Sequence, residues 1–151
     1  MKQDIKEILF SEEVLTKRIK ELAEEISTDY KGKDLLVVGI LKGSVIFAAE
    51  LIKNISTPCE IDFMAVSSYG NSTETSGIVR ILKDLDNNIE GKDILIVEDI
   101  VDTGVTLAYL LKYLKARKAN SIEIVALLNK PARRTSDLDV KYIGFEVPDG
   151  F

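Results

Sequence analysis

The sequence has no histidine and no tryptophan, and it has one cysteine among its 151 residues. Without histidine, the chain lacks the usual base of Ser-His and Cys-His catalysis and the commonest zinc ligand. A single cysteine excludes an intramolecular disulfide. No apolar run is long enough to span a membrane, and no secretory pattern opens the chain. Acid–base chemistry must therefore use carboxylates, lysines or tyrosines, and the cytoplasm is the expected location.

Positive charge is also scarce. The formal net charge is −5 and the sequence pI is about 4.9. No stripe of lysines and arginines dominates any face that the periodicity reveals, which argues against a general nucleic-acid surface, although a nucleotide pocket can still be locally positive. With 46% hydrophobic residues, the chain is long enough for one domain with a real core, and we expect a single domain over residues 1–151.

Periodicity predicts alternating helices and strands. Apolar residues at helical spacing follow Ser11, which can cap a helix that ends near Lys31-Gly32. Further helices are expected over residues 44–55 and 106–118, and strands over residues 35–41, 59–66, 78–82, 94–97, 122–128 and 142–147. Residues 67–77 are mostly polar and predict a long loop. The alternation predicts an α/β fold with a mostly parallel central sheet flanked by helices.

The most informative segment is residues 94–106, Ile-Leu-Ile-Val-Glu-Asp-Ile-Val-Asp-Thr-Gly-Val-Thr. The apolar strand places Glu98 and Asp99 at its carboxyl end, where open α/β sheets bind ligands. The following turn supplies backbone N–H groups at a helix N-terminus, and Gly104 lets the backbone approach an anion closely. The two carboxylates can bind a ribose diol, and the backbone N–H groups of the turn can bind its phosphate. Together they predict a ribose 5-phosphate site.

Two other readings of this segment are available. A buried strand followed by a capped helix would need no ligand, and Asp102 would then be the helix N-cap. The run Ile-Leu-Ile-Val-Glu-Asp also resembles the first strand of response-regulator receiver domains, where paired acids bind magnesium. In a receiver domain this strand opens the chain, whereas here more than ninety residues precede it. The turn after the acids also has no role in a receiver domain.

The segment resembles, at every position, the phosphoribosyl diphosphate signature of type I phosphoribosyltransferases. This implies the fold of that family, with a small hood beside the sheet, and a 5′-phosphate loop formed by Asp102, Thr103, Gly104, Val105 and Thr106. Glu98 and Asp99 would contact the ribose and reach Mg²⁺ mainly through water. Asp102 would be the general acid/base beside the purine N7, with its pKa raised by burial.

A second segment, Val-Gly-Ile-Leu-Lys-Gly-Ser over residues 38–44, resembles the diphosphate loop of hypoxanthine-guanine phosphoribosyltransferases. The resemblance implies that Leu41, Lys42 and Gly43 bind diphosphate and that the Leu41-Lys42 peptide is cis. Read alone, Lys42 could equally be an exposed lysine in an ordinary turn.

Further positions match the same family. Ser68 and Tyr69 match its closing lid, which would keep water from an oxocarbenium-like state, although an isolated polar stretch is usually only a loop. Lys130 matches a lysine that donates to O6 of 6-oxopurines, and Arg134 matches an arginine that helps to bind diphosphate. Phe151 aligns with the aromatic residue that stacks on the purine. Without the resemblance, Lys130 would read as a solvated lysine at a strand end.

The resemblance implies a transferase that converts hypoxanthine or guanine and phosphoribosyl diphosphate into IMP or GMP, with Mg²⁺ as cofactor. A homodimer or homotetramer is expected, with no nucleic-acid or membrane partner. The alternatives are a xanthine-preferring relative and a noncatalytic regulator of the same fold that binds RNA. The chain lacks the family's usual segment after Phe151, so part of the hood is expected to be missing and the purine pocket to lose one wall.

Overall fold

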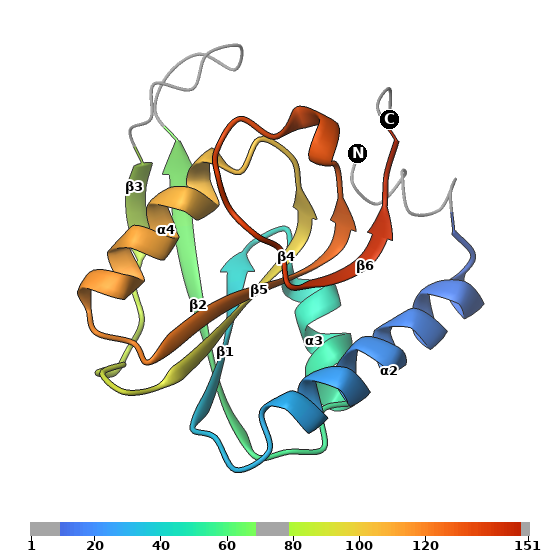
Figure 1. The fold of residues 1–151 in the computed structure, drawn as a ribbon, viewed down its shortest axis with the longest axis horizontal. Helices are drawn as coiled ribbons and strands as arrows, with labels where there is room; N and C mark the ends of the chain where they lie inside the picture. The colour runs from blue at the N-terminus through green and yellow to red at the C-terminus, as the bar shows by residue number, and fades with distance from the viewer. Residues whose placement is uncertain (1–9, 69–78, 149–151) are drawn as a thin grey trace.

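The structure is a computed structural model that describes residues 10–68 and 79–148. Within these ranges, six strands form one sheet in the order β3-β2-β1-β4-β5-β6 (Figure 1). The strands are β1 (Leu35–Leu41), β2 (Cys59–Ser68), β3 (Val79–Lys83), β4 (Asp93–Val101), β5 (Ser121–Asn129) and β6 (Tyr142–Glu146). Neighbouring strands are parallel except β2 and β3, which pair antiparallel. The predicted mostly parallel α/β sheet is confirmed.

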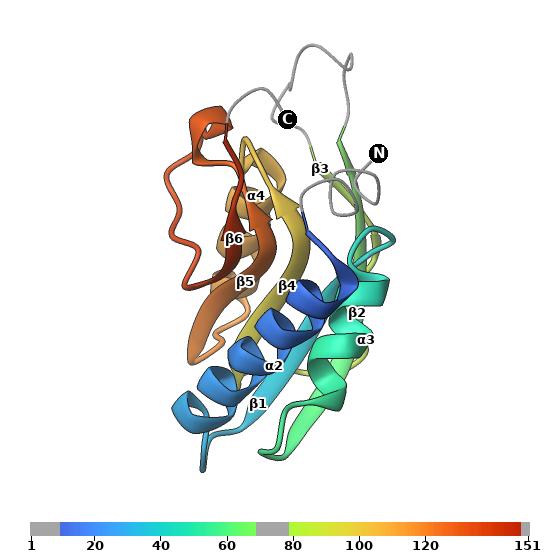
Figure 2. The same ribbon diagram turned by 90° about the vertical axis from the view of Figure 1, so that its right-hand side faces the viewer.

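Three helices cover the two faces of this sheet. Helices α2 (Glu12–Asp29) and α3 (Val45–Lys53) lie on one face, and α4 (Val105–Ala116) lies on the other (Figure 2). Ser11 caps α2 as predicted, because its hydroxyl accepts a hydrogen bond from the Val14 N–H at 3.2 Å. A short 3₁₀ helix, η1 (Pro131–Arg133), follows β5 and was not predicted.

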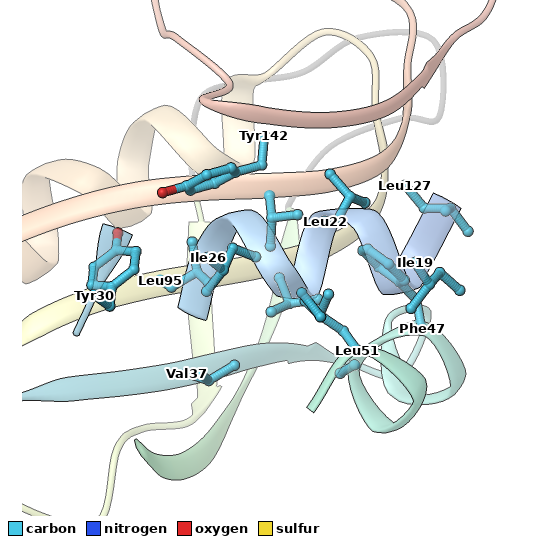
Figure 3. Packing of buried hydrophobic residues seen from close by; sticks show 14 of the residues in the cluster. Ile19, Leu22, Ile26, Tyr30, Val37, Phe47, Leu51, Leu95, Leu127 and Tyr142 are labelled. Carbon is cyan, nitrogen blue, oxygen red and sulfur yellow. The ribbon is translucent and has the colours of Figure 1, made fainter. Parts of the chain in front are cut away.

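Each face of the sheet has its own apolar core. Leu22 and Ile26 of α2, Phe47 and Leu51 of α3, and Leu95 of β4 pack together in the first core (Figure 3). Leu110 and Leu114 of α4 pack in the second, against the opposite faces of the same strands. Each of these seven residues is at most 1% exposed, and truncating such a side chain to alanine typically costs about 2–5 kcal/mol. These two cores fix the central strands whose carboxyl ends carry the candidate site.

Two predicted strand ends are wrong in ways that affect the site. Ser67 and Ser68, which were expected to open a loop, instead extend β2 and pair with Arg80 and Val79 of β3. Strand β4 does not end before Glu98 but continues to Val101. In both cases neighbouring strands supply hydrogen-bond partners to polar residues, which outweighs their weak intrinsic preference for strands.

None of the described helices is both long and apolar enough to cross a membrane.

Candidate functional site

A pocket of about 250 Å³ lies at the carboxyl ends of β1 and β4. These two strands are adjacent in the sheet. The chain continues from β1 through β2 to β3 on one side and from β4 through β5 to β6 on the other side. Such a switch point is where open α/β sheets leave a crevice for ligands. The pocket is lined by Ile40, Leu41, Gly43, Val66, Glu98, Ile100, Val101, Asp102, Thr103, Gly104, Val105, Thr106 and Leu107.

The crevice opens because β1 and β4 stop pairing with each other before either strand ends. Their parallel pairing extends from Leu35 opposite Asp93 to Gly39 opposite Val97. Beyond this point β1 continues to Leu41 and β4 to Val101 without further pairing to each other. The space between the two strand ends is therefore available to a ligand.

Glu98 and Asp99 lie within β4, which the sequence predicted to end at Val97. Because β4 continues through them, their side chains point to opposite faces of the strand. Glu98 lines the pocket, whereas Asp99 is 2% exposed and is not among the lining residues. The two acids therefore have different surroundings, and Glu98 is the one placed to meet a ligand in the pocket.

The predicted phosphate loop is the wall of the pocket formed by the turn before α4. Gly104 has φ +81°, in the left-handed region, and is the N-cap of the helix, which begins at Val105. The first N–H groups of a helix have no partner within the helix, so they are available to an anion. A Cβ at Gly104 would lie 2.8 Å from Leu138 Cδ2 and 3.1 Å from Arg134 Cδ. The backbone conformation favours glycine here, and an added Cβ would also have to displace the Leu138 and Arg134 side chains.

Asp102 is the first residue of this loop and lines the pocket. The side chain is exposed, so the burial expected from the sequence is wrong, because the loop projects beyond the sheet edge. Asp102 is also not the helix N-cap, since Gly104 takes that position. One carboxylate oxygen accepts a hydrogen bond from the Thr103 N–H at 2.7 Å, which holds the side chain beside the loop. The exposed carboxylate is accessible to a bound substrate.

The turn between β1 and α3 forms the facing wall. The Leu41-Lys42 peptide is cis, as predicted. Ser44 is fully buried, and its hydroxyl donates to the Ile40 carbonyl at 2.7 Å, which tightens the turn. Leu41 and Gly43 line the pocket, while Lys42 is exposed and is not among the lining residues.

The segment after β5 lies against the phosphate loop. Lys130 is 9% exposed, and its backbone N–H donates to the Val101 carbonyl at 2.9 Å. Arg134 is half-buried and is not among the residues that line the pocket. Its Nε donates to the Asp102 carbonyl at 2.8 Å, and its Nη2 donates to Asn129 Oδ1. The contact with Asn129 was not predicted, because an amide at a strand end forms no distinctive sequence pattern.

The remaining predicted positions fall partly outside the described residues. Tyr69 and Phe151 lie outside them. Ser68 is the last residue of β2 and pairs with Val79 of β3. The lid and the stacking aromatic stay predictions. The structure does bring Glu98 and the loop 102–106 together with Leu41 and Gly43 around one pocket.

The charge of the pocket is unexpected for an anion site. Among its described lining residues, the charged side chains are the carboxylates of Glu98 and Asp102, and no lysine or arginine is included. An anionic ligand must therefore be held by backbone N–H groups and hydroxyls, and it needs a cation to offset the carboxylates. No group of three or more His, Cys, Asp or Glu side chains that could hold a metal occurs in the described residues. This donor set fits Mg²⁺, which binds through few carboxylates, substrate oxygens and water.

The chain is similar to known protein sequences over its whole length. The family model described as "Phosphoribosyl transferase domain" matches residues 7–151. The chain is 54% identical over 151 residues to the hypoxanthine-guanine phosphoribosyltransferase of Bacillus subtilis, covering 100% of this chain and 84% of the relative. It is 52% identical, with the same coverage of both, to the enzyme of that name from Staphylococcus aureus strain Mu50.

Solved structures agree with the sequence comparison. A hypoxanthine phosphoribosyltransferase from Staphylococcus aureus superimposes with a TM-score of 0.91 at 52% identity, over 93% of this chain and 77% of that one. A hypoxanthine-guanine phosphoribosyltransferase from Bacillus anthracis superimposes with a TM-score of 0.88 at 47% identity, over 93% and 83% of the two chains. The similarity therefore extends over nearly the whole chain in both sequence and fold.

Proposed function

The chain belongs to the phosphoribosyltransferase family, and from this premise we propose a function for the pocket between β1 and β4. The protein transfers the 5-phosphoribosyl group of phosphoribosyl diphosphate to hypoxanthine or guanine, which yields IMP or GMP and diphosphate. This pentosyl transfer is a reaction of purine salvage. The observation that carries the proposal is the similarity of the chain to enzymes named for this reaction. The turn of residues 102–106 in this chain lies at the switch point of its sheet, where such a fold binds ligands.

We assign the 5′-phosphate of the substrate to the loop of residues 102–106. The support is geometric: Thr103, Gly104, Val105 and Thr106 line the pocket, and the first N–H groups of α4 face no helical partner. The helix dipole adds favourable interaction with an anion at this end. We assign diphosphate to the facing turn of Leu41, Lys42 and Gly43.

The ribose hydroxyls and Mg²⁺ belong, in this proposal, between the two walls. Glu98 would accept from the ribose hydroxyls and hold the metal mainly through water. A water-mediated contact of Asp99 with the metal stays a prediction, because its side chain is buried on the other face of β4. When bound, Mg²⁺ supplies positive charge that stabilises the diphosphate leaving group. The carboxylate-lined pocket supports this assignment, since a highly anionic substrate cannot approach two carboxylates without a cation. Chelation of Mg²⁺ should abolish nucleotide formation.

The purine is placed at the end of β5. Lys130 would donate to O6 of the base, and Phe151 would stack on its ring. Asp102 would hold or move the proton at N7, a task for which its exposed position at the pocket mouth is suitable. Closure by Ser68 and Tyr69 would exclude water from the reacting sugar. A xanthine-preferring enzyme or a noncatalytic regulator is not favoured, because the relatives are named hypoxanthine-guanine phosphoribosyltransferases.

We also propose that the protein assembles as a homodimer or homotetramer, and a cytoplasmic location stays a prediction. An apolar surface beside α3 supports assembly: Ile46 is 66% exposed on that helix. Ile61 of β2 is 49% exposed and pairs in register with Val37, whose side chain lies on the sheet face that α3 covers. Exposed apolar side chains on the same face of a sheet are consistent with an interface there.

Sedimentation velocity tests this assembly. Ile46→Glu should shift the protein toward the monomer, because a charge buried in an interface lacks a partner. Val14→Glu, at a similarly exposed position on α2, is the matched control and should leave the mass unchanged. A monomeric wild-type protein at micromolar concentration would refute the assignment.

A single assay tests the proposed reaction. Purified protein, hypoxanthine, phosphoribosyl diphosphate and Mg²⁺ should give IMP and diphosphate in equal amounts. Replacing phosphoribosyl diphosphate by ribose 5-phosphate should give none, because no diphosphate leaving group is present. Absence of IMP under the first condition would refute the function.

A further inference from the structure

Arg134 connects the phosphate loop to the strand end that carries Lys130. Its Nε donates to the Asp102 carbonyl at 2.8 Å, and its Nη2 donates to Asn129 Oδ1. Its Cδ lies only 3.1 Å from the position that a Cβ on Gly104 would take. One side chain therefore contacts the loop by a hydrogen bond at Asp102 and by packing at Gly104.

Asn129 extends this connection to β6. It is the last residue of β5 and is 4% exposed. Its side-chain amide donates to the Glu146 carboxylate at 3.3–3.4 Å, and its backbone carbonyl accepts from the Val147 N–H at 2.8 Å. The amide oxygen and nitrogen of this buried side chain are thus both used, one toward Arg134 and one toward Glu146.

Backbone contacts follow the same route. The N–H groups of Thr135 and Ser136 donate to the Thr103 carbonyl at 3.0 and 3.2 Å, and the Lys130 N–H donates to the Val101 carbonyl at 2.9 Å. The segment 129–136 therefore lies along the loop 101–104 and is bonded to it at both ends. In the proposed function, this segment carries the residue that reads the base, and the loop carries the phosphate site and the acid/base.

We propose that Arg134 is a positioning residue that fixes the loop of Asp102, Thr103 and Gly104 against the base-reading segment, with Asn129 as its anchor. This inference rests on the proposed function of the pocket. It differs from direct binding of diphosphate, the role predicted for Arg134 from the sequence, because its guanidinium is directed at the loop backbone and at Asn129 and not into the pocket.

Positioning and diphosphate binding predict different kinetics. Loss of the guanidinium would remove the donor to the Asp102 carbonyl and to the buried Oδ1 of Asn129, and the loop would shift relative to the base. A displacement of about 1 Å in a reacting geometry can cost about 100-fold in rate. Arg134→Met should therefore lower kcat by about tenfold to a hundredfold, with a smaller rise in the KM for phosphoribosyl diphosphate and unchanged binding of free diphosphate.

A conservative variant separates the two roles further. Lysine keeps the positive charge but cannot present the two donors of a planar fork to two acceptors at once. Arg134→Lys should therefore remain close to Arg134→Met in kcat. If Arg134 instead binds diphosphate as a charge, lysine should recover most of the activity, and the loss in methionine should appear as a raised KM and weaker binding of free diphosphate.

Hydrogen exchange gives a readout that does not depend on activity. In Arg134→Met the amides of Thr135 and Ser136 should exchange at least tenfold faster, while amides of the β1 core keep their wild-type protection and report an intact fold. Arg133→Met, at the exposed neighbouring arginine, is the matched control and should change neither exchange nor kcat. If the core amides of Arg134→Met also lose protection, Arg134→Gln and Arg134→Lys replace it in the same comparison.

The outcomes are distinguishable. A raised KM for phosphoribosyl diphosphate with kcat retained, activity restored by lysine, or unchanged exchange at Thr135 and Ser136 would each overturn the positioning role. A wild-type protein that forms no nucleotide would overturn the proposed function instead, and the exchange experiment would still decide whether Arg134 holds the loop.

Discussion

Lys130 lies one residue beyond the end of β5, and the residue as a whole is only 9% exposed. A site built to donate a hydrogen bond to one polar group discriminates strongly against an analogue that cannot accept it. Lys130→Met should therefore lose most activity toward hypoxanthine and most of its discrimination against adenine. Steady-state kinetics with both bases checks this, with Lys112→Met on the exposed face of α4 as control. Wild-type discrimination in Lys130→Met would show that another group reads O6.

The exposed carboxylate of Asp102 is the group placed to exchange a proton with the bound purine. Asn keeps the size of the side chain but cannot transfer a proton, so Asp102→Asn should lower kcat by about 100-fold or more. Binding of phosphoribosyl diphosphate with Mg²⁺, measured by calorimetry, should change much less. Asp137→Asn, at an exposed carboxylate nearby in the sequence, is the control. Equal losses in binding and turnover would make Asp102 a structural residue of the loop.

Phosphate binding depends on the turn before α4. A comparison of Gly104 in this turn with Gly91 elsewhere separates the effect of backbone strain from the effect of packing. Gly104 and Gly91 have nearly the same positive φ, +81° and +79°, but a Cβ at Gly91 would meet nothing within 4 Å. Gly91→Ala should cost only the left-handed strain, about 1–2 kcal/mol. Gly104→Ala should cost more, because it also displaces Leu138 and Arg134, and it should weaken binding of phosphoribosyl diphosphate. Urea unfolding and calorimetry measure the two effects.

Equal stability losses and unchanged ligand binding in the two glycine variants would contradict this account of the turn. The comparison is informative because backbone strain is matched and only the packing differs. It therefore isolates the contribution of Leu138 and Arg134 to the shape of the loop.

Elements with a clear apolar period were predictable from the sequence, and those decided by pairing were not. Strand β1 has the predicted bounds, and α2 begins at its predicted cap, because burial and capping are local properties of the sequence. The extension of β4 to Val101 depends on hydrogen bonds to β5, which the local composition of Glu98 and Asp99 does not encode. The loop 102–106 was recognisable from its residue pattern, whereas the Arg134–Asn129 contact joins residues whose conformations depend on the folded segment after β5.

In the molecule as a whole, the ligand pocket and a stabilising cluster of hydrogen bonds lie at opposite ends of the sheet strands. The carboxyl ends of β1 and β4 hold the pocket, while the amino ends of β4 and β5 are tied together by Asp93. Its carboxylate accepts hydrogen bonds from Asn120 and Ser121 at 2.8 and 2.7 Å. Burial alone would raise the pKa of Asp93, but these hydrogen bonds outweigh burial and hold the pKa below its usual value.

This lowered pKa predicts an acid-dependent loss of stability. The folded state binds the Asp93 proton less readily than the unfolded state, so the stabilisation is complete above the usual aspartate pKa of about 3.9 and is lost as the pH falls below it. Between pH 5 and about pH 3, the free energy of unfolding should fall more steeply in the wild type than in Asp93→Asn. Urea titrations at several pH values measure the slopes, and identical slopes would contradict the assignment. Nucleotide formation at neutral pH should be retained.

In the proposed function, the pocket between β1 and β4 transfers a phosphoribosyl group to a 6-oxopurine. The most direct test measures nucleotide formation from hypoxanthine, guanine, xanthine and adenine, each with phosphoribosyl diphosphate, in the presence of Mg²⁺ and after its removal by a chelator. We expect IMP and GMP with Mg²⁺, far less product from adenine, and no product once Mg²⁺ is removed. Product from adenine at the rate of hypoxanthine, or full activity without any divalent cation, would refute the proposed function.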